Sequence, residues 1–150
     1  MKLSKYFILA ELTPSSTAKR LGIKNDPTPE HLESLKILAV NVLDKVREHF
    51  DKPIWVSSGY RSKALNDATP GSSPTSQHCL GEAADIDCNE LNPDIFKYIK
   101  EHLEFDQLIW EFGTDAEPDW VHVSFSKDRK RKQVLKAVKV KGKTQYIPYV

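Results

Sequence analysis

The sequence predicts an α+β fold, a single domain in which a central, mostly antiparallel sheet is backed by helices. A length of 150 residues, with 39% hydrophobic and 29% charged residues, suits one globular domain spanning residues 1–150. Helix and strand patterns follow one another without the strict alternation that a parallel sheet requires. Two expected strands carry polar side chains along one face, which indicates that this face of the sheet is open.

The N-terminal third of the chain carries the signals of two helices. Residues 15–22 offer Ser and Thr for an N-cap and a final Gly, which predicts a short helix. Thr28 precedes Pro29, a favoured first helical residue, and apolar residues recur every three or four positions over residues 31–50. This spacing predicts an amphipathic helix, and Pro53 marks its end.

The middle of the chain combines expected strands with an irregular loop. A strand is expected over residues 54–58, whereas residues 67–76 are rich in Gly, Pro, Ser and Thr, which is typical of an exposed loop. A short buried strand is expected over residues 83–88. Asn92 then caps a helix, and a further strand is expected over residues 107–112.

A turn, one more central strand and a hairpin are expected at the C-terminal end. Residues 113–118 form the turn, and residues 120–125 form the last central strand. Residues 134–148 contain two short apolar runs around Lys-Gly-Lys, which predicts a hairpin. We expect this hairpin to be peripheral to a core that spans about residues 4–125.

Four polar side chains in two segments predict a zinc site. His78 follows directly after the irregular loop, while strand alternation places Asp85 and His122 on polar faces. If the two strands are neighbours, these three residues can supply the N and O ligands of a catalytic zinc and leave a fourth position open. Asp119, just before its strand, is then free to act as a proton-transfer base.

Each of these side chains alone has a simpler interpretation. A single His is usually a hydrogen-bonded core residue, and a single Asp usually lies in a cap or turn, so only the combination favours a metal. Glu82, Asp87 and Glu111 are competing carboxylates. Gly81 would allow a sharp turn after the first ligand. Arg61 could hold a substrate carboxylate or stabilise an oxyanion, with a surface salt bridge as the alternative.

The spacing resembles a known family of zinc peptidases. The motif Ser-x-His-x-x-Gly-x-Ala-x-Asp is present as Ser76, His78, Gly81, Ala83 and Asp85, followed by Asp119 and His122. This arrangement is similar to that of the zinc D-alanyl-D-alanine carboxypeptidases, vancomycin-resistance dipeptidases and bacteriophage endolysin peptidases, and the Hedgehog signalling domain shares their fold. Residues 57–62 look like the family's stretch around its arginine, and the N-terminal segment is similar to short phage or prophage members.

The resemblance implies a peptidase that cuts stem or cross-bridge peptides of peptidoglycan, as a carboxypeptidase or an endopeptidase. It implies one zinc ion held by His78, Asp85 and His122. Asp119 would be the general base, where many members carry the longer Glu, and Arg61 would polarise the scissile carbonyl. Ser76 and Trp120, together with Arg61, are the expected substrate contacts. The alternative is a non-catalytic zinc-containing module of the same fold that binds peptidoglycan or a protein.

Composition and charge exclude several other classes. No apolar run reaches the roughly 18 residues of a membrane span, and no secretory signal begins the chain, so we expect a cytoplasmic origin and no membrane insertion. Action on the cell wall would then follow phage lysis or carriage in a virion. A net charge of +1 predicts no nucleic-acid partner, and the basic residues 127–132 are interpreted as a solvated face. A monomer is expected. Cys79 and Cys88 could form a disulfide after export, but a cytoplasmic origin favours free thiols.

Overall fold

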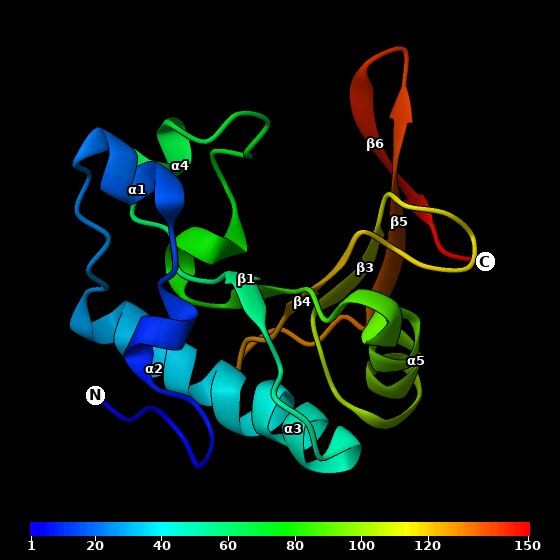
Figure 1. The fold of residues 1–150 in the computed structure, drawn as a ribbon, viewed down its shortest axis with the longest axis horizontal. Coiled ribbons are helices and arrows are strands. Elements are labelled where there is room, and N and C mark those ends of the chain that lie inside the picture. Colours follow the sequence, from blue (N-terminus) through cyan, green and yellow to red (C-terminus); the bar gives the residue numbers. More distant parts are fainter.

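A six-stranded sheet organises the protein, whose computed structural model describes all residues 1–150 (Figure 1). The strand order is β1-β2-β4-β3-β5-β6, and every neighbouring pair is antiparallel except β3 and β5. The strands are β1 (Val56–Ser58), β2 (Ala83–Ile86), β3 (Gln107–Glu111), β4 (Trp120–Ser124), β5 (Gln133–Val140) and β6 (Lys143–Pro148). The predicted single-domain α+β fold with a mostly antiparallel sheet is therefore confirmed.

The helices gather on one side of this sheet and at one end of it (Figure 1). They are α1 (Ser16–Leu21), α2 (Pro29–Leu38), α3 (Asp44–Phe50), α4 (Lys63–Asp67) and α5 (Asn92–His102), with short 3₁₀ turns at Leu9–Leu12, Gln77–Leu80 and Asn89–Leu91. Figure 1 shows α2, α3 and α5 along the lower side of the sheet, while α1 and α4 lie beside its β1 end. No helix has both the length and the apolar character that crossing a bilayer requires.

The long amphipathic helix expected over residues 31–50 is present, but a π-helical segment, Ala39–Leu43, interrupts it between α2 and α3. The side-chain amide of Asn41 donates a hydrogen bond to the carbonyl of Ile37, one turn earlier. A side chain inserted in this way competes with the regular backbone ladder, which gives a physical reason for the wider turn. The apolar side of the helix still reaches the core.

The core lies between the helices and one face of the sheet. Alternation along β2, β3 and β4 directs apolar side chains to that face, where they are buried against α2, α3 and α5. The sheet contributes Ala84, Ile86, Leu108, Trp110, Val121 and Val123. The opposite face carries Asp85 and His122, as alternation predicts, and no helix packs across it (Figure 1).

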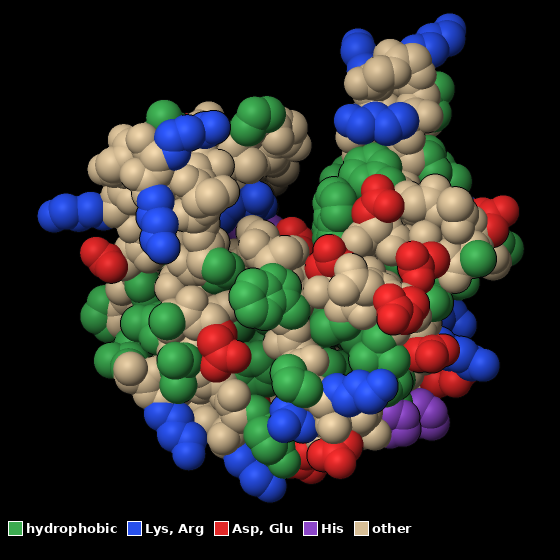
Figure 2. All heavy atoms as spheres, viewed as in Figure 1, with side chains coloured by type: hydrophobic (Ala, Val, Ile, Leu, Met, Phe, Trp, Pro, Cys, Tyr) green, Lys and Arg blue, Asp and Glu red, His purple; other side chains and the backbone are tan.

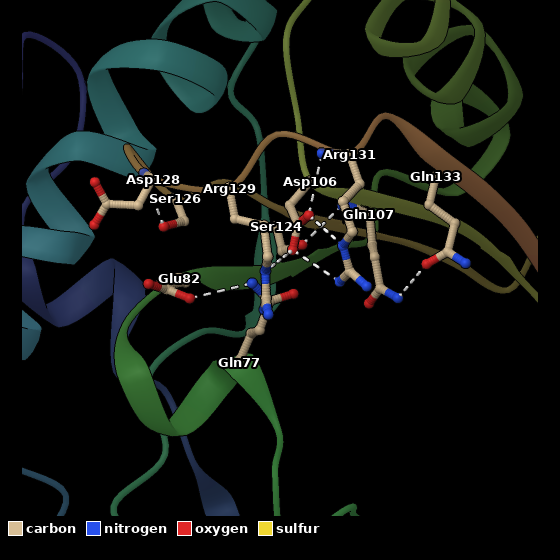
Figure 3. A network of polar contacts seen from close by, with 10 residues as sticks. All are labelled: Gln77, Glu82, Asp106, Gln107, Ser124, Ser126, Asp128, Arg129, Arg131 and Gln133. Atoms are coloured by element: carbon tan, nitrogen blue, oxygen red, sulfur yellow. Dashed lines mark hydrogen bonds and ion pairs between the residues drawn. The ribbon is translucent and has the colours of Figure 1, made fainter.

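The connection from β4 to β5 is held by Asp106, a fully buried carboxylate just before β3 (Figure 3). Arg131 donates to both of its oxygens, from Nε at 2.7 Å and from Nη2 at 3.0 Å, and Arg129 donates from Nε at 3.1 Å. Residues 127–132 are all exposed, as expected of a solvated face, and two of them, Arg129 and Arg131, also pair with Asp106. Their pairing with Asp106 fixes the chain where it turns to run parallel to β3.

The predicted C-terminal hairpin is present as β5 and β6. β5 also joins the sheet through five parallel pairs with β3, from Gln107 opposite Gln133 to Glu111 opposite Ala137. The far part of the hairpin extends beyond the body of the domain (Figure 1). Its base is therefore continuous with the sheet, while its end projects alone.

Candidate metal centre

Three side chains from three separate elements converge on the open face of the sheet. They are His78 from the Gln77–Leu80 turn, Asp85 from β2 and His122 from β4. One ligand atom of each lies within 4.8 Å of those of the other two, which is a spacing that could accommodate one metal ion. The structure therefore brings together the three residues that the sequence predicts as ligands.

Asp85 and His122 are placed by strand register. They are directly opposite each other in the antiparallel pair of β2 and β4, so both side chains project from the same face. Nδ1 of His122 lies 3.0 Å from Oδ1 of Asp85. Residues at such opposed positions have closely spaced Cβ atoms, and the sheet itself therefore holds two of the three candidate ligands.

His78 is positioned by its local turn and by a backbone carbonyl. Ser76 caps the turn, because its hydroxyl accepts a hydrogen bond from the backbone N–H of His78. Nδ1 of His78 lies 2.7 Å from the carbonyl oxygen of Gly59, and Nε2 lies 3.4 Å from Oδ1 of Asp85. A second contact of this kind is the usual way in which proteins orient an imidazole that ligates a metal. The buried ring thus presents Nε2 to the cluster.

Two glycines allow this close packing around His78. A Cβ on Gly59 would lie 2.2 Å from the carbonyl oxygen of Leu12, so no larger residue fits where the backbone supports the imidazole. Gly81 has a φ of +73° and a Cβ there would lie 2.4 Å from the carbonyl oxygen of His31. The expected sharp turn at Gly81 is therefore present, and it needs glycine for two independent reasons.

The electrostatics of the cluster favour an ionised Asp85. Burial raises the pKa of this carboxyl, but the charge of His78, the hydrogen bond from His122 and the further contacts with both imidazoles lower it well below its usual range. Two imidazole nitrogens and one carboxylate oxygen form a donor set that suits zinc. The residues present therefore fit the metal that the sequence predicts.

Arg61 lies beside the cluster, at the edge of the same site. Its backbone N–H donates to the carbonyl of His78, and its Nη2 donates to the Ser76 hydroxyl at 3.3 Å. The Nε of Arg61 is buried and has no hydrogen-bond partner. Nη1 also makes no hydrogen bond within the chain and is not among the buried atoms, so this end of the guanidinium can bind an oxygen of a bound molecule. Ser76 therefore serves both the turn of His78 and the placement of Arg61.

Asp119 lies immediately before β4, as the proline ahead of it suggests, and outside the three-residue cluster. Its backbone N–H donates to the carbonyl of Glu111, and its own carbonyl accepts from Nδ2 of Asn92 at 3.3 Å. Its carboxylate is exposed and takes part in no hydrogen bond or ion pair within the chain. The backbone is thus fixed, while the carboxylate has no partner within the chain.

Trp120 follows Asp119 and shares the open face with His122. Its ring is half-buried and packs edge-on against Phe112, with ring centroids 5.5 Å apart. The indole thus lies on the same face as the cluster.

The sequence profile of the peptidase M15 family matches residues 5–124. The chain belongs to the peptidase M15 family. This confirms the resemblance to zinc D-alanyl-D-alanine carboxypeptidases, and M15 peptidases are zinc-dependent. None of the curated proteins matches the chain. The three candidate ligands, Arg61 and Asp119 all lie within the matched residues, whereas the β5–β6 hairpin lies outside them.

The other carboxylates near the M15 site differ in their surroundings. Glu82 accepts a hydrogen bond from Gln77 at 3.1 Å, and Asp87 accepts from Asn92 at 3.0 Å, so both have partners away from the cluster. Glu111 is 6% exposed and lies on the open face, opposite Trp120 in the pairing of β3 and β4. Burial raises the pKa of Glu111 to about 7, although the charge of His122 opposes this.

Sequence reasoning treated Glu111 only as a competitor for the metal. Alternation along β3 places Glu111 on the polar face, but its burial depends on the hairpin that packs beside it. Cys79 and Cys88 are free thiols, and neither belongs to the cluster.

Proposed function

We propose that this protein is a zinc metallopeptidase that hydrolyses peptide bonds in bacterial peptidoglycan. The observation that carries the proposal is the convergence of His78, Asp85 and His122 on the open face, in a chain of the M15 family. These three residues would hold the zinc. When bound, zinc supplies a Lewis acid that acts on water and on the scissile carbonyl. Arg61 and Asp119 supply the remaining groups.

Asp119 is proposed as the general base. Its exposed carboxylate has no partner in the chain, while hydrogen bonds at both its backbone N–H and its carbonyl fix its position next to β4. It takes a proton from the attacking water as the water oxygen bonds to the carbonyl carbon. The same proton passes to the leaving nitrogen as the C–N bond breaks, which releases an amine and a carboxylic acid.

Arg61 is proposed to bind the charged oxygen that develops at the scissile carbonyl. Its Nε is buried and its Nη2 donates to Ser76, so the guanidinium is oriented before substrate arrives. The same group can hold a carboxylate of the substrate. Trp120 is proposed to contact the peptide beside the metal, since it shares the open face with His122.

The proposed substrates are stem or cross-bridge peptides, cut as by a carboxypeptidase or by an endopeptidase. The cell wall is the proposed place of action, reached through phage lysis or as part of a virion, and a monomer is sufficient for the site because one chain supplies every proposed ligand.

Product analysis tests the proposal directly. Zinc-loaded protein is incubated with peptidoglycan fragments, and mass spectrometry identifies each new amine and acid. Asp119→Asn should keep about one zinc per chain and lose kcat by roughly 10²- to 10⁴-fold, as expected for a general base. His122→Ala should lose both zinc and activity, whereas the exposed Asp128→Asn should match the parent.

Two results would contradict the proposal in different ways. A parent protein that binds zinc and fragments but releases no amine would be a binding module rather than a peptidase. A parent protein that binds no zinc with all three candidate ligands intact would exclude the metal site itself.

A further inference from the structure

The β5–β6 hairpin stands beside the metal centre but lies outside the residues that match the M15 family. Figure 1 shows the hairpin and the α1–α4 end of the domain as two projections that rise from the sheet. Figure 2 shows the surface hollowed between them, with basic, acidic and histidine side chains at the bottom of the hollow. The hairpin therefore forms a wall of this hollow.

Strand register places Tyr146 on the metal-centre face of the hairpin. Tyr146 is directly opposite Ala137 of β5, Ala137 is opposite Glu111 of β3, and Glu111 is opposite Trp120 of β4. Side chains directly opposite each other across a sheet project from the same face, so Tyr146 shares the face of Trp120 and His122. The Tyr146 side chain is 55% exposed, which leaves its surface available to a ligand.

The charges that act on the Tyr146 hydroxyl belong to the metal centre. Burial of the hydroxyl raises the pKa of Tyr146, the negative charges of Glu111 and Asp85 raise it further, and Arg61 lowers it. Electrostatic effects of this kind require proximity. The hairpin rises on the side of the open face (Figure 1), so these charges act on Tyr146 although β6 is four strands away from β2.

The charged side chains of the hairpin and of the residues after it are all positive. Residues 133–150 contain four lysines and no Asp or Glu. Lys139 lies two residues beyond Ala137 on the metal-centre face, and its Nζ is 5.5 Å from the centre of the Phe112 ring. Phe112 in turn contacts Trp120. Contacts thus lead from Lys139 through Phe112 to Trp120 on the face of the site, and a cation in this position favours an acidic ligand.

We propose that the β5–β6 hairpin is a substrate-binding wall that recognises an acidic peptide, with Tyr146 as a hydrogen-bond donor to the bound peptide and Lys139 as the partner of a peptide carboxylate. This proposal rests on the proposed peptidase function and adds a selectivity that the residues matched to the family do not contain. Peptides with a free carboxylate beyond the scissile bond should bind better than the same peptides with that group amidated.

Binding is measured on zinc-loaded Asp119→Asn by calorimetry, with a purified stem peptide and its amidated form as the two probes. Tyr146→Phe should weaken binding of both probes by roughly three- to tenfold, as for one lost hydrogen bond. Lys139→Gln should weaken binding of the acidic probe alone, by roughly two- to fivefold. In the parent background, the same substitutions should raise KM more than they change kcat.

Two variants of the same hairpin serve as matched controls. Lys143 and Gln145 alternate with Thr144 and Tyr146, so they point to the opposite face. Lys143→Gln removes the same charge as Lys139→Gln, and Gln145→Ala alters a neighbour of Tyr146. Both should bind like the parent, and thermal unfolding should show all four variants folded.

The outcomes separate this inference from the proposed function. If the parent cleaves peptidoglycan peptides and neither Tyr146→Phe nor Lys139→Gln differs from the two controls, the inference is overturned and the peptidase stands. If Lys143→Gln weakens binding of the acidic probe as much as Lys139→Gln does, the assignment of Lys139 to the metal-centre face is likewise overturned. If the parent binds but cleaves nothing, and Tyr146→Phe weakens binding, the peptidase proposal fails while the binding wall is supported. If zinc-loaded Asp119→Asn binds neither the stem peptide nor its amidated form, the inference is overturned.

Discussion

Asp85 and His122 occupy directly opposed positions on β2 and β4, with Oδ1 of Asp85 3.0 Å from Nδ1 of His122 and 3.4 Å from Nε2 of His78. One carboxylate oxygen thus lies between two imidazoles. The contacts of this oxygen with both rings hold the three groups together. Because the sheet fixes two of them, metal binding requires little rearrangement of the backbone.

Asp85→Asn should remove zinc binding, since an amide is a poor replacement for an anionic ligand. Loss of a residue that only hydrogen-bonds to a metal ligand already weakens metal affinity by about 10- to 100-fold. Loss of a direct ligand should therefore weaken zinc affinity by more than about 100-fold. Zinc at roughly 100 times Kd should stabilise the parent by about 2.7 kcal/mol and leave the variant unchanged. Metal analysis after dialysis and thermal unfolding with and without zinc measure both effects.

The exposed Glu90 provides the control for Asp85→Asn. Glu90→Gln removes one negative charge after β2 without touching the cluster, and it should bind zinc like the parent. Equal zinc content in Asp85→Asn and the parent would exclude Asp85 as a ligand.

Local patterns were sufficient to predict most of the elements and the three candidate ligands. The amphipathic helix, the hairpin and the strands around Asp85 and His122 each depend on a periodicity within a few residues. The pairing of β2 with β4 then follows from their shared polar faces. These are short-range signals, and the tertiary structure agrees with them.

The features that were missed depend on contacts between distant segments. The parallel pairing of β5 with β3 is accompanied by ion pairs of Asp106 with Arg129 and Arg131, and each arginine is more than 20 residues from Asp106 in sequence. The place of Tyr146 follows from register across four strands, which no local pattern indicates. The helix α4 was absent from the sequence prediction because its five residues precede a loop rich in Gly, Pro and Ser.

Gly81→Ala should destabilise the protein and displace His78. The backbone at Gly81 has a φ of +73°, and the new Cβ would lie 2.4 Å from the carbonyl of His31. The left-handed conformation alone costs about 1–3 kcal/mol for a residue other than glycine, and the clash adds to this. Urea unfolding measures the loss, and zinc affinity reports the displaced ligand. Gly142→Ala has a similar φ of +77° with no nearby atoms, so it should lose stability without affecting zinc.

Asp106→Asn should lower stability in a manner that depends on pH. Burial raises the pKa of Asp106, but the hydrogen bonds and charges of Arg131, and the charge of Arg129, lower it below its usual value of 3.8. A lowered folded-state pKa gives stability that is present above the unfolded pKa and is lost as pH falls through the folded pKa. The variant should therefore be less stable than the parent by about 2 kcal/mol at pH 7, and the difference should shrink in strong acid.

Urea unfolding at a series of pH values tests the role of Asp106, with Asp128→Asn as control. Asp128 is exposed and lies in the same connection, yet its carboxylate has no partner. A difference that stays constant from neutral to strongly acid pH would show that the Asp106 charge is not the cause.

Glu111→Gln should stabilise the metal-free protein at high pH. Burial raises the pKa of Glu111 from 4.5 to about 7, so ionising this carboxyl costs more in the folded than in the unfolded state. Because the folded-state pKa is raised, the parent loses stability as pH rises from about 4.5 to 7, and the whole cost is present above 7. A shift of this size corresponds to about 3 kcal/mol, which glutamine would avoid. With EDTA present, urea unfolding should therefore show similar stabilities at pH 4 and a more stable variant at pH 8.

Zinc should narrow the difference in stability between Glu111→Gln and the parent at pH 8, since a nearby cation favours the ionised carboxyl of the parent. Equal stability of parent and variant across the whole pH range would show that Glu111 does not carry this cost.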